Sequence, residues 1–209
     1  MAAIVPGGTG TVNATYTYDG NGNMTAGNGR TTTWTSFNKV ATITRGTASV
    51  AFDYNGEHTR IRQVTASATT HYITDPATGV SLEKVMGSGG SVQWNLYVRA
   101  GGKLVAQRID ATPSGGGAST VAMRYFTTDH LGSIAVITDE LGAVVERLSY
   151  DAWGKRRFPS GADGPSGSIT SQTTRGFTGH EMIDEVVRRA KRFAGAFRPP
   201  AADRASPST

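Results

Sequence analysis

The stretch Tyr125–Gly154, YFTTDHLGSIAVITDELGAVVERLSYDAWG, contains three Asp-x-x-Gly motifs. Between two of them the β-branched run Ile134–Thr138 is followed by a return run, Ala143–Ser149. Asp at the first position of a type I turn accepts hydrogen bonds from nearby backbone amides, and Gly at the fourth position tolerates a left-handed conformation. The stretch therefore predicts hairpins of short antiparallel strands.

The same turn pattern recurs along the whole chain. Five of the ten aspartates have Gly three residues later: Asp19, Asp53, Asp129, Asp139 and Asp151. Because each of these carboxylates is expected to cap a turn, none is a strong candidate for catalysis. The recurring acids are expected to shape bends and to do no chemistry.

The clearest single strand is the run from residue 92 to residue 98. One face carries Val92, Trp94, Leu96 and Val98, and the other carries Gln93, Asn95 and Tyr97. This period of two is typical of a half-buried strand. The Gly pair after Ala100 predicts a hairpin turn, from which Lys103–Asp110 returns as the partner strand.

Aromatic residues mark comparable places along the chain. The anchors are Tyr18, Phe37, Tyr54, Tyr72, Tyr97, Phe126 and Tyr150. Most of their spacings lie near 18–25 residues, and a Gly- and Ser-rich stretch lengthens one interval. A degenerate period of this length predicts a repeat in which each unit is a strand, a turn and a strand. Aromatics at matching positions would then stack across neighbouring strands.

Three stretches resemble the YD-repeat or rearrangement-hot-spot (RHS) family. Residues 16–24 (YTYDGNGNM) look like the tyrosine–aspartate repeat, residues 125–157 look like the RHS-associated core, and residues 175–181 (RGFTGHE) continue it. The resemblance covers roughly residues 15–187. It implies that the hairpins wind into a spiralling antiparallel sheet, which in this family closes as a hollow shell around a C-terminal toxin domain.

The expected fold is therefore all-β: antiparallel hairpin repeats form a curved or spiralling sheet, a partial RHS shell, with a short C-terminal helix. The expected parts are a flexible N-terminal segment (1–14), YD-type repeat hairpins (15–112), a Gly/Ser-rich insertion (113–119), an RHS-associated core segment (120–187) and a basic atypical tail (188–209). The resemblance implies a structural, non-enzymatic fragment of a shell that encapsulates and delivers a C-terminal polymorphic toxin in interbacterial competition.

A partial shell of perhaps ten strands cannot close, so its sheet should end in unpaired edges. Such edges favour pairing with another RHS chain or with a second copy. The resemblance adds a C-terminal toxin domain and its delivery machinery as partners, and a secreted or cell-surface location. The N-terminus shows no signal peptide. The longest apolar run, Ile134–Ile137, is far shorter than the about 20 residues that span a bilayer.

The tail departs from the family pattern. Beyond Glu185 the family continues with a hydrophobic segment and an Arg-x-Tyr-Asp-Pro-x-x-Gly-Arg-Phe run, whereas this chain reads VVRRAKRFAGAFRPP over residues 186–200. The net charge of +5 arises within residues 188–209, so the balanced remainder predicts no nucleic-acid partner. Apolar residues at helical spacing from Ile183 onward predict a basic amphipathic helix that stops at Pro199. We interpret this end as frameshifted or recombined.

No residue set indicates catalysis, a cofactor or a metal. The absence of Cys excludes a thiolate nucleophile, a disulfide and a Cys zinc site. The run His180-Glu181-Met-Ile-Asp184 lacks the second His of the H-E-x-x-H zinc signature, and a helix start is the expected structure. Asp129-His130 has no accompanying Ser or Cys nucleophile motif. The glycines of residues 7–10 and 20–22 precede neither a helix nor a Gly-Lys-Ser/Thr sequence, so no phosphate loop is expected.

Two other functions stay open. A cell-surface module that binds carbohydrate or protein would present exposed, coplanar aromatics such as Trp34, Trp94 and Trp153. An autoprocessing aspartyl protease remnant, which the family resemblance brings into view, would need aspartates beyond the Gly-His-Glu stretch. The sequence offers Asp184 and Asp203 there.

The interpretation of the tail can be tested at the DNA level. We expect one forward frame beyond the codon for Glu185 to encode a Tyr-Asp-Pro-x-x-Gly-like continuation. Translating the downstream DNA in all three frames checks this. If no frame contains such a continuation, the tail is not a frameshifted end.

Overall fold

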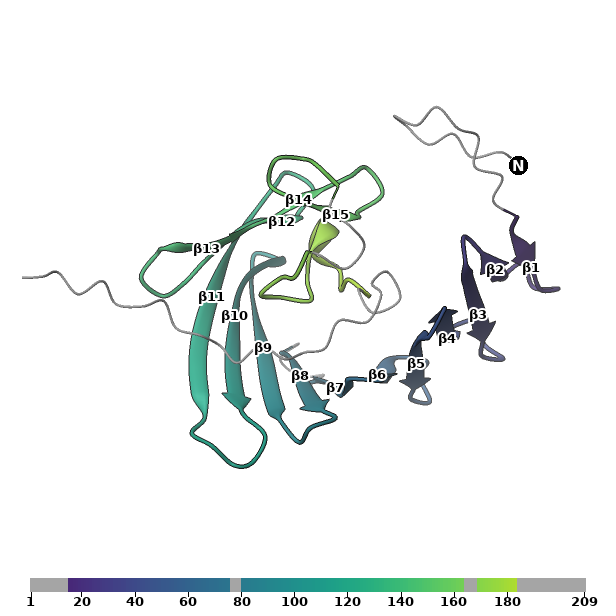
Figure 1. The fold of residues 1–209 in the computed structure, drawn as a ribbon, viewed down its shortest axis with the longest axis horizontal. Coiled ribbons are helices and arrows are strands. Elements are labelled where there is room, and N and C mark those ends of the chain that lie inside the picture. The colour runs from purple at the N-terminus through teal and green to yellow at the C-terminus, as the bar shows by residue number, and fades with distance from the viewer. Residues whose placement is uncertain (1–14, 76–79, 164–168, 184–209) are drawn as a thin grey trace, which may run out of the picture.

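The computed structural model describes residues 15–75, 80–163 and 169–183. The expectations for the segment 1–14 and for the basic tail with its helix lie outside these residues. Within them the chain is nearly all β, as predicted, and one sheet holds thirteen antiparallel strands instead of about ten (Figure 1). Each strand of this sheet is hydrogen-bonded to the next along the chain.

The strands follow sequence order without a crossover. They are β1 (Thr17–Tyr18), β2 (Met24–Gly27), β3 (Arg30–Trp34), β4 (Val40–Arg45), β5 (Ala48–Tyr54), β6 (Arg60–Thr65), β7 (Ala68–Thr74), β8 (Ser81–Gly87), β9 (Val92–Ala100), β10 (Lys103–Thr112), β11 (Thr120–Thr128), β12 (Ile134–Thr138) and β13 (Val144–Arg147). A separate hairpin pairs β14 (Ser149–Tyr150) with β15 (Arg156–Arg157), and a single 3₁₀ turn, η1, spans Phe177–Gly179.

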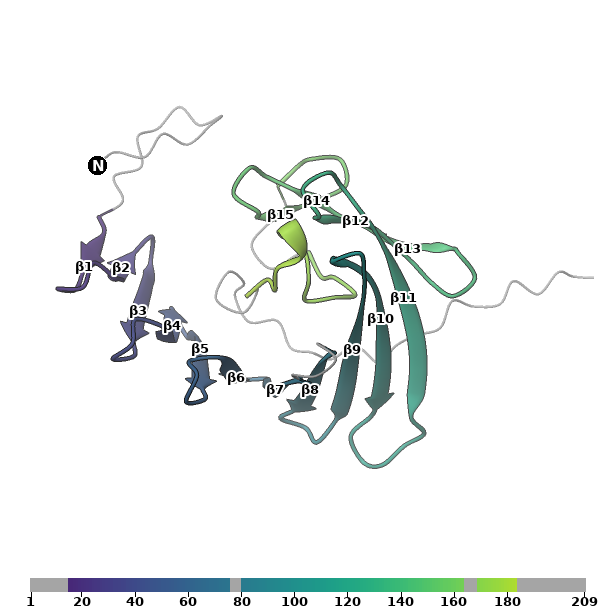
Figure 2. The ribbon, with the colours of Figure 1, turned by 180° about the vertical axis from the view of Figure 1, so that it is seen from behind.

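The sheet is strongly curved at its C-terminal end. Strands β8 to β12 bend around η1 and the chain beside it, while β1 to β7 extend away as a narrower twisted ribbon (Figures 1 and 2). Among the described strands, β1 and β13 each pair on one side only, so the sheet is not closed. The expected partial, curved sheet is therefore confirmed.

Several hairpins at one end of the strands share a five-residue turn. The backbone N–H of its first residue donates to the carbonyl of its fifth, as in the bond from Asp19 to Asn23 at 2.9 Å and from Asp129 to Ser133 at 2.9 Å. The carboxylate of Asp129 also accepts from the amides of Leu131 and Ser133, at 2.9 and 2.8 Å. These bonds fix the turn because they satisfy amides that the strands leave unpaired.

The predicted turn at Asp53 is wrong by two residues. The five-residue turn here starts at Asn55, whose amide donates to Thr59 at 3.0 Å, and His58 takes the left-handed position with φ 60°. Asp53 lies within β5 and pairs with Arg62 at 2.5 Å. An Asn can cap this turn as an Asp does. The Asp-x-x-Gly pattern therefore placed the start of the turn two residues too early.

At three of these turns, an aromatic residue directly before the turn ties its unit to the previous one. Trp34 Nε1 donates to the carbonyl of Met24 at 2.9 Å, and the Tyr54 hydroxyl donates to Val40 at 2.8 Å. Tyr150 donates to the carbonyl of Ile134 at 3.0 Å. In the second unit, Trp34 therefore holds the anchor position that the aromatic spacing had predicted for Phe37.

The core divides between two small clusters on the concave side of the sheet. The larger comprises Tyr97, Leu104, Phe126, Ile134, Ile137 and Leu148, and the smaller centres on Val50 and Phe52. The alternation predicted for residues 92–98 is present, but the buried side is the polar one: Asn95 is 2 % exposed, whereas Val98 is 40 % exposed. In the part of the chain that the structure describes, no helix is long and apolar enough to span a membrane.

The corrected position of the turn predicts that replacing Asp129 and replacing Asp53 lower the free energy of unfolding by different amounts. Asp129→Ala removes two carboxylate–amide bonds and should lower the free energy of unfolding by about 1–2 kcal/mol. Asp53→Ala removes one exposed ion pair and should change it by less than about 0.5 kcal/mol. Urea denaturation of the purified variants measures both. Equal losses would show that Asp53 caps a turn after all.

Candidate functional site

Residues 169–183 lie against the concave face and bring two Glu–Tyr–Arg clusters together there. In each cluster the sheet supplies a tyrosine, and the C-terminal segment supplies one member of an ion pair. We call this contact the C-terminal seam, defined by Arg60, Tyr72, Glu83, Tyr97, Arg175 and Glu181 with the backbone of residues 171–178. The seam is the most chemically distinctive part of the described structure.

The first cluster joins β6 and β7 to Glu181. The Tyr72 hydroxyl donates to Glu181 Oε1 at 2.7 Å and lies 3.1 Å from Gln63 Oε1. Arg60 forms an ion pair with the other oxygen of Glu181, and its guanidinium carbon lies 4.5 Å from the centroid of the Tyr72 ring. The Glu181 side chain is only 8 % exposed, so the arginine compensates a largely desolvated charge.

The second cluster joins β8 and β9 to Arg175. Its carboxylate, Glu83, is 1 % exposed and forms an ion pair with Arg175. The Tyr97 hydroxyl donates to Glu83 Oε2 at 3.0 Å and lies 3.2 Å from the Thr174 hydroxyl. The Arg175 guanidinium carbon lies 4.7 Å from the centroid of the Tyr97 ring. This arrangement repeats the first cluster with the acid and the base exchanged between sheet and segment.

Burial and the neighbouring acids keep both phenols protonated. Burial, with Glu181 beside it, raises the pKa of Tyr72, and burial, with Glu83 beside it, raises the pKa of Tyr97. Burial raises the pKa of Glu83, while Arg175 acts in the opposite direction. Although burial alone would lower the pKa of Arg175, Glu83 and its neighbours raise it overall. The tyrosines are therefore donors and the carboxylates acceptors.

Backbone contacts hold the segment in register with the sheet. Arg156 Nη2 donates to the carbonyls of Thr173 and Arg175, at 2.9 and 3.0 Å. Glu146 on β13 accepts from the Gln172 amide at 2.7 Å and from the Ser171 hydroxyl at 3.0 Å. Together with the two ion pairs, these hydrogen bonds fix the position of the C-terminal segment.

Glycine is required where η1 meets the β14–β15 hairpin. A Cβ on Gly154, which has φ +84°, would lie 2.8 Å from the Phe177 ring. A Cβ on Gly176 would lie 2.9 Å from Met182 and 3.1 Å from the Tyr150 hydroxyl. The segment therefore packs closely as well as through charges.

The structure disperses the residues that the sequence had singled out for chemistry. Asp129 caps a turn, and His130 beside it is exposed. His180 Nδ1 lies 2.6 Å from the Thr178 hydroxyl, and Glu181 belongs to the seam. Glu181 forms a bridge with Arg175, and residues 182 and 183 belong to no helix, so the helix start expected at residue 180 is wrong.

The structure does not bring the other sequence-predicted candidates together either. Asp184, Asp203 and the glycines of residues 7–10 lie outside the described residues, and the glycines of residues 20–22 form the first turn of the sheet. Trp34, Trp94 and Trp153 lie on β3, on β9 and after β14, so they do not share one platform. Among the described residues no group of three His, Asp or Glu side chains could hold a metal ion.

Sequence reasoning missed most of the seam. Of its six side chains, Tyr72 and Tyr97 had appeared as repeat anchors and Arg175 and Glu181 within the stretch 175–181. Arg60 and Glu83 had not been singled out, and no pairing among the six was predicted. The missed signal is the polar side of the β8 and β9 alternation, where Glu83 and Asn95 are directly opposed. A buried Glu without a nearby Arg in sequence could have suggested a distant partner.

Comparison with solved structures reveals a likeness in fold. The crystal structure of TcdB2-TccC3 matches with a TM-score of 0.58 and 16% identity, covering 81% of this chain and 9% of that chain. TcdB2-TccC3-Cdc42 gives 0.56 and 16%, covering 81% and 8%. The Tc holotoxin pore of Photorhabdus luminescens gives 0.51 and 16%, covering 66% and 7%. Neither the protein-family models nor the curated proteins give a match.

The likeness supports a fold of the kind found in part of these Tc toxin chains. The likeness extends over 66–81% of this chain but over less than a tenth of the length of each matched chain. At this level of identity it concerns the course of the backbone and not individual side chains. The seam and its residues are therefore described from this structure alone.

The seam makes a prediction about stability. Glu83→Ala leaves Arg175 with its main partner removed, and should lower the free energy of unfolding by about 3–5 kcal/mol. The exposed pair of Arg108 and Asp110 provides a matched control, since Asp110→Ala should cost less than about 1 kcal/mol. Chemical denaturation followed by tryptophan fluorescence measures both.

A double variant separates the ion pair from general packing. Glu83→Gln combined with Arg175→Met removes both charges and should cost less than the sum of the two single changes. Strict additivity of the two single losses would show that Glu83 and Arg175 do not act as a pair.

Proposed function

We propose that this chain is a wall segment of an RHS-type shell that encapsulates and delivers a C-terminal toxin, and that its role is structural rather than enzymatic. The observation that carries the proposal is the uninterrupted meander of thirteen strands, curved around an inward-held C-terminal segment. The fold likeness to Tc toxin chains that contain RHS shells supports a role of this general kind. The sequence resemblance to the RHS-associated core supports the finer assignment, to interbacterial competition.

A structural role agrees with the chemistry of the seam. Each carboxylate there is paired with an arginine and accepts a bond from a tyrosine that keeps its proton. A catalytic acid or base needs a proton to exchange near neutral pH, and a nucleophile needs an adjacent base. Both carboxylates of the seam are already held by an arginine and a tyrosine, and this pairing supports a structural role.

The proposal assigns the two open edges a partner: another RHS chain or a second copy. Strand β13 shows Val144 and Val145 at its surface, 49 % and 38 % exposed, beside main-chain groups that face no described strand. Such an edge is a template for pairing with a further strand.

Self-association through these edges can be measured. At tens of micromolar we expect light scattering to give a mass above 21.9 kDa that rises with concentration. Val145→Lys should lower that mass because a charge on an edge strand opposes pairing. Met86→Lys is the control, since Met86 is 38 % exposed, as Val145 is, but is paired on both sides, with Thr69 of β7 and Val92 of β9. A monodisperse monomer at all concentrations would contradict pairing through the edges.

A further inference from the structure

Two arginines lie on the concave face of the sheet near its N-terminal end. Ile43 on β4 is directly opposite Val50 on β5 and Thr32 on β3. Arg45 and Arg30 each lie two residues from this row, within regularly paired stretches of β4 and β3. Since side chains two residues apart along a strand point to the same face, Arg30 and Arg45 share the face that carries Val50.

Neither arginine has an acid beside it in the described structure. None of the ion pairs between described residues involves Arg30 or Arg45. Arg30 Nε is buried and has no hydrogen-bond partner among the described residues. Burial, together with the charge of Arg45, lowers the pKa of Arg30. Like charges on adjacent strands are unfavourable, so a carboxylate placed between these two side chains would be stabilising.

The C-terminal segment advances across the strands toward this pair. Glu181 contacts β6 and β7 through Arg60 and Tyr72, and Ile183 packs against the small apolar cluster of β4 and β5. Two residues of extended chain span about 7 Å, and neighbouring strands are about 4.8 Å apart. A further step of two residues in the same direction therefore ends over β3 and β4.

The sequence places an acid at that step. The described chain reaches Ile183, and Asp184 and Glu185 follow it. Glu181 and Ile183 both contact the sheet, so in an extended continuation Glu185 is the next residue on the sheet side and Asp184 points away. A carboxylate from the segment and an arginine from the sheet would repeat the chemistry that already holds the segment at β6.

We propose that the concave face of β3 and β4 is the docking site of residues 184–185 of this chain, with the Glu185 carboxylate bound between Arg30 and Arg45. The C-terminal segment then crosses the sheet as one strap, which joins the curved part of the sheet to the narrow ribbon of N-terminal strands (Figure 1). The chain's own acid is favoured over that of a second copy, because two residues tether it to the docked Ile183 and raise its effective concentration. The inference concerns contacts within one chain and is independent of the shell proposal.

Carbodiimide cross-linking of the full chain tests the contact. Arg45→Lys keeps the positive charge and supplies a primary amine. The carbodiimide activates a carboxylate, the neighbouring amine displaces the activated oxygen, and an amide forms with net loss of one water, which converts the carbodiimide into a urea. We expect peptide mapping by mass spectrometry to find residue 45 joined to Glu185. Adding Glu185→Gln should abolish this link, whereas adding Asp184→Asn should leave it.

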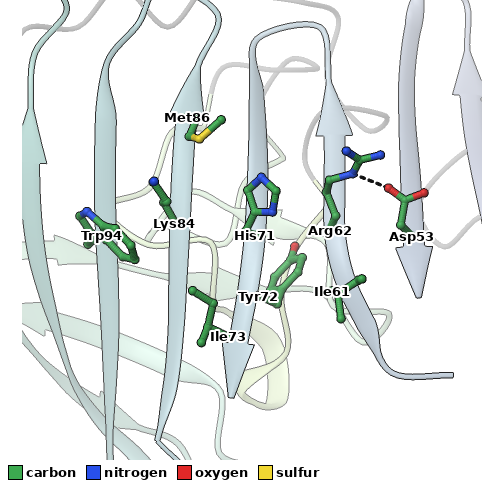
Figure 3. A pocket seen from close by; sticks show the side chains of 9 residues that line it. All are labelled: Asp53, Ile61, Arg62, His71, Tyr72, Ile73, Lys84, Met86 and Trp94. Atoms are coloured by element: carbon green, nitrogen blue, oxygen red, sulfur yellow. Dashed lines mark hydrogen bonds and ion pairs between the residues drawn. The ribbon is translucent and has the colours of Figure 1, made fainter. Parts of the chain in front are cut away.

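Two controls come from ion pairs that the structure shows. Arg62→Lys is the matched variant, because its partner Asp53 lies with it on the opposite face of the sheet (Figure 3). It should join residue 62 to Asp53 and not to Glu185. The native pair of Lys155 and Asp163, at 3.0 Å, should be linked in every variant and reports that the reagent is active.

Three results would overturn the proposal. The first is no link between residues 45 and 185 in a sample whose two control pairs are linked. The second is a link from residue 45 that persists with Glu185→Gln, which would assign the arginine to another acid. The third appears when isotope-labelled and unlabelled chains are mixed before cross-linking. Links between labelled and unlabelled peptides would assign the site to a second copy.

Discussion

The capped five-residue turn is the constraint on which the rest of this structure depends. In a strand the side chains alternate between faces, so a shift of one residue in register would exchange the two faces completely. The backbone bonds within each turn, with the carboxylate of Asp19, Asp129 or a comparable residue, leave one register available. The aromatic donors Trp34, Tyr54 and Tyr150 add a second tie between units. Turn geometry therefore decides which side chains reach the seam.

With the register fixed, the sheet encloses polar groups rather than an ordinary apolar core. Gln107 Nε2 donates to Asn95 Oδ1 at 3.0 Å beside the Glu83 cluster, and all three residues are nearly completely buried. Replacing such groups by apolar side chains is often neutral or stabilising, so their presence calls for another explanation. The ion pairs of Arg175 and Arg60 form only when the C-terminal segment lies in one position against the sheet. The seam therefore contributes specificity of placement more than net stability.

Much of the fold could be predicted from the sequence because the turns are local. The hairpins around Asp139 and after Ala100, and the strand at residues 134–138, follow from short-range backbone preferences. The turn at Asn55 was misplaced because Asn, Asp and Thr can all begin it, so the motif does not define its frame uniquely. The seam was not predictable in this way. Arg60 and Glu181 are 121 positions apart, and no local pattern joins them.

The same alternation that brings acids inward sends basic and aromatic residues outward. Along β8 and β9, Glu83 and Tyr97 face the seam, whereas Lys84 and Trp94 line a shallow groove on the other face of the sheet (Figure 3). In the seam, each of the two carboxylates is paired with an arginine of the same chain. On the opposite face, Arg62 forms an ion pair with Asp53, but Lys84 two strands away has no carboxylate partner among the described residues. The two faces therefore differ in charge pairing: the seam pairs its own carboxylates and arginines, whereas Lys84 on the opposite face has no carboxylate partner among the described residues.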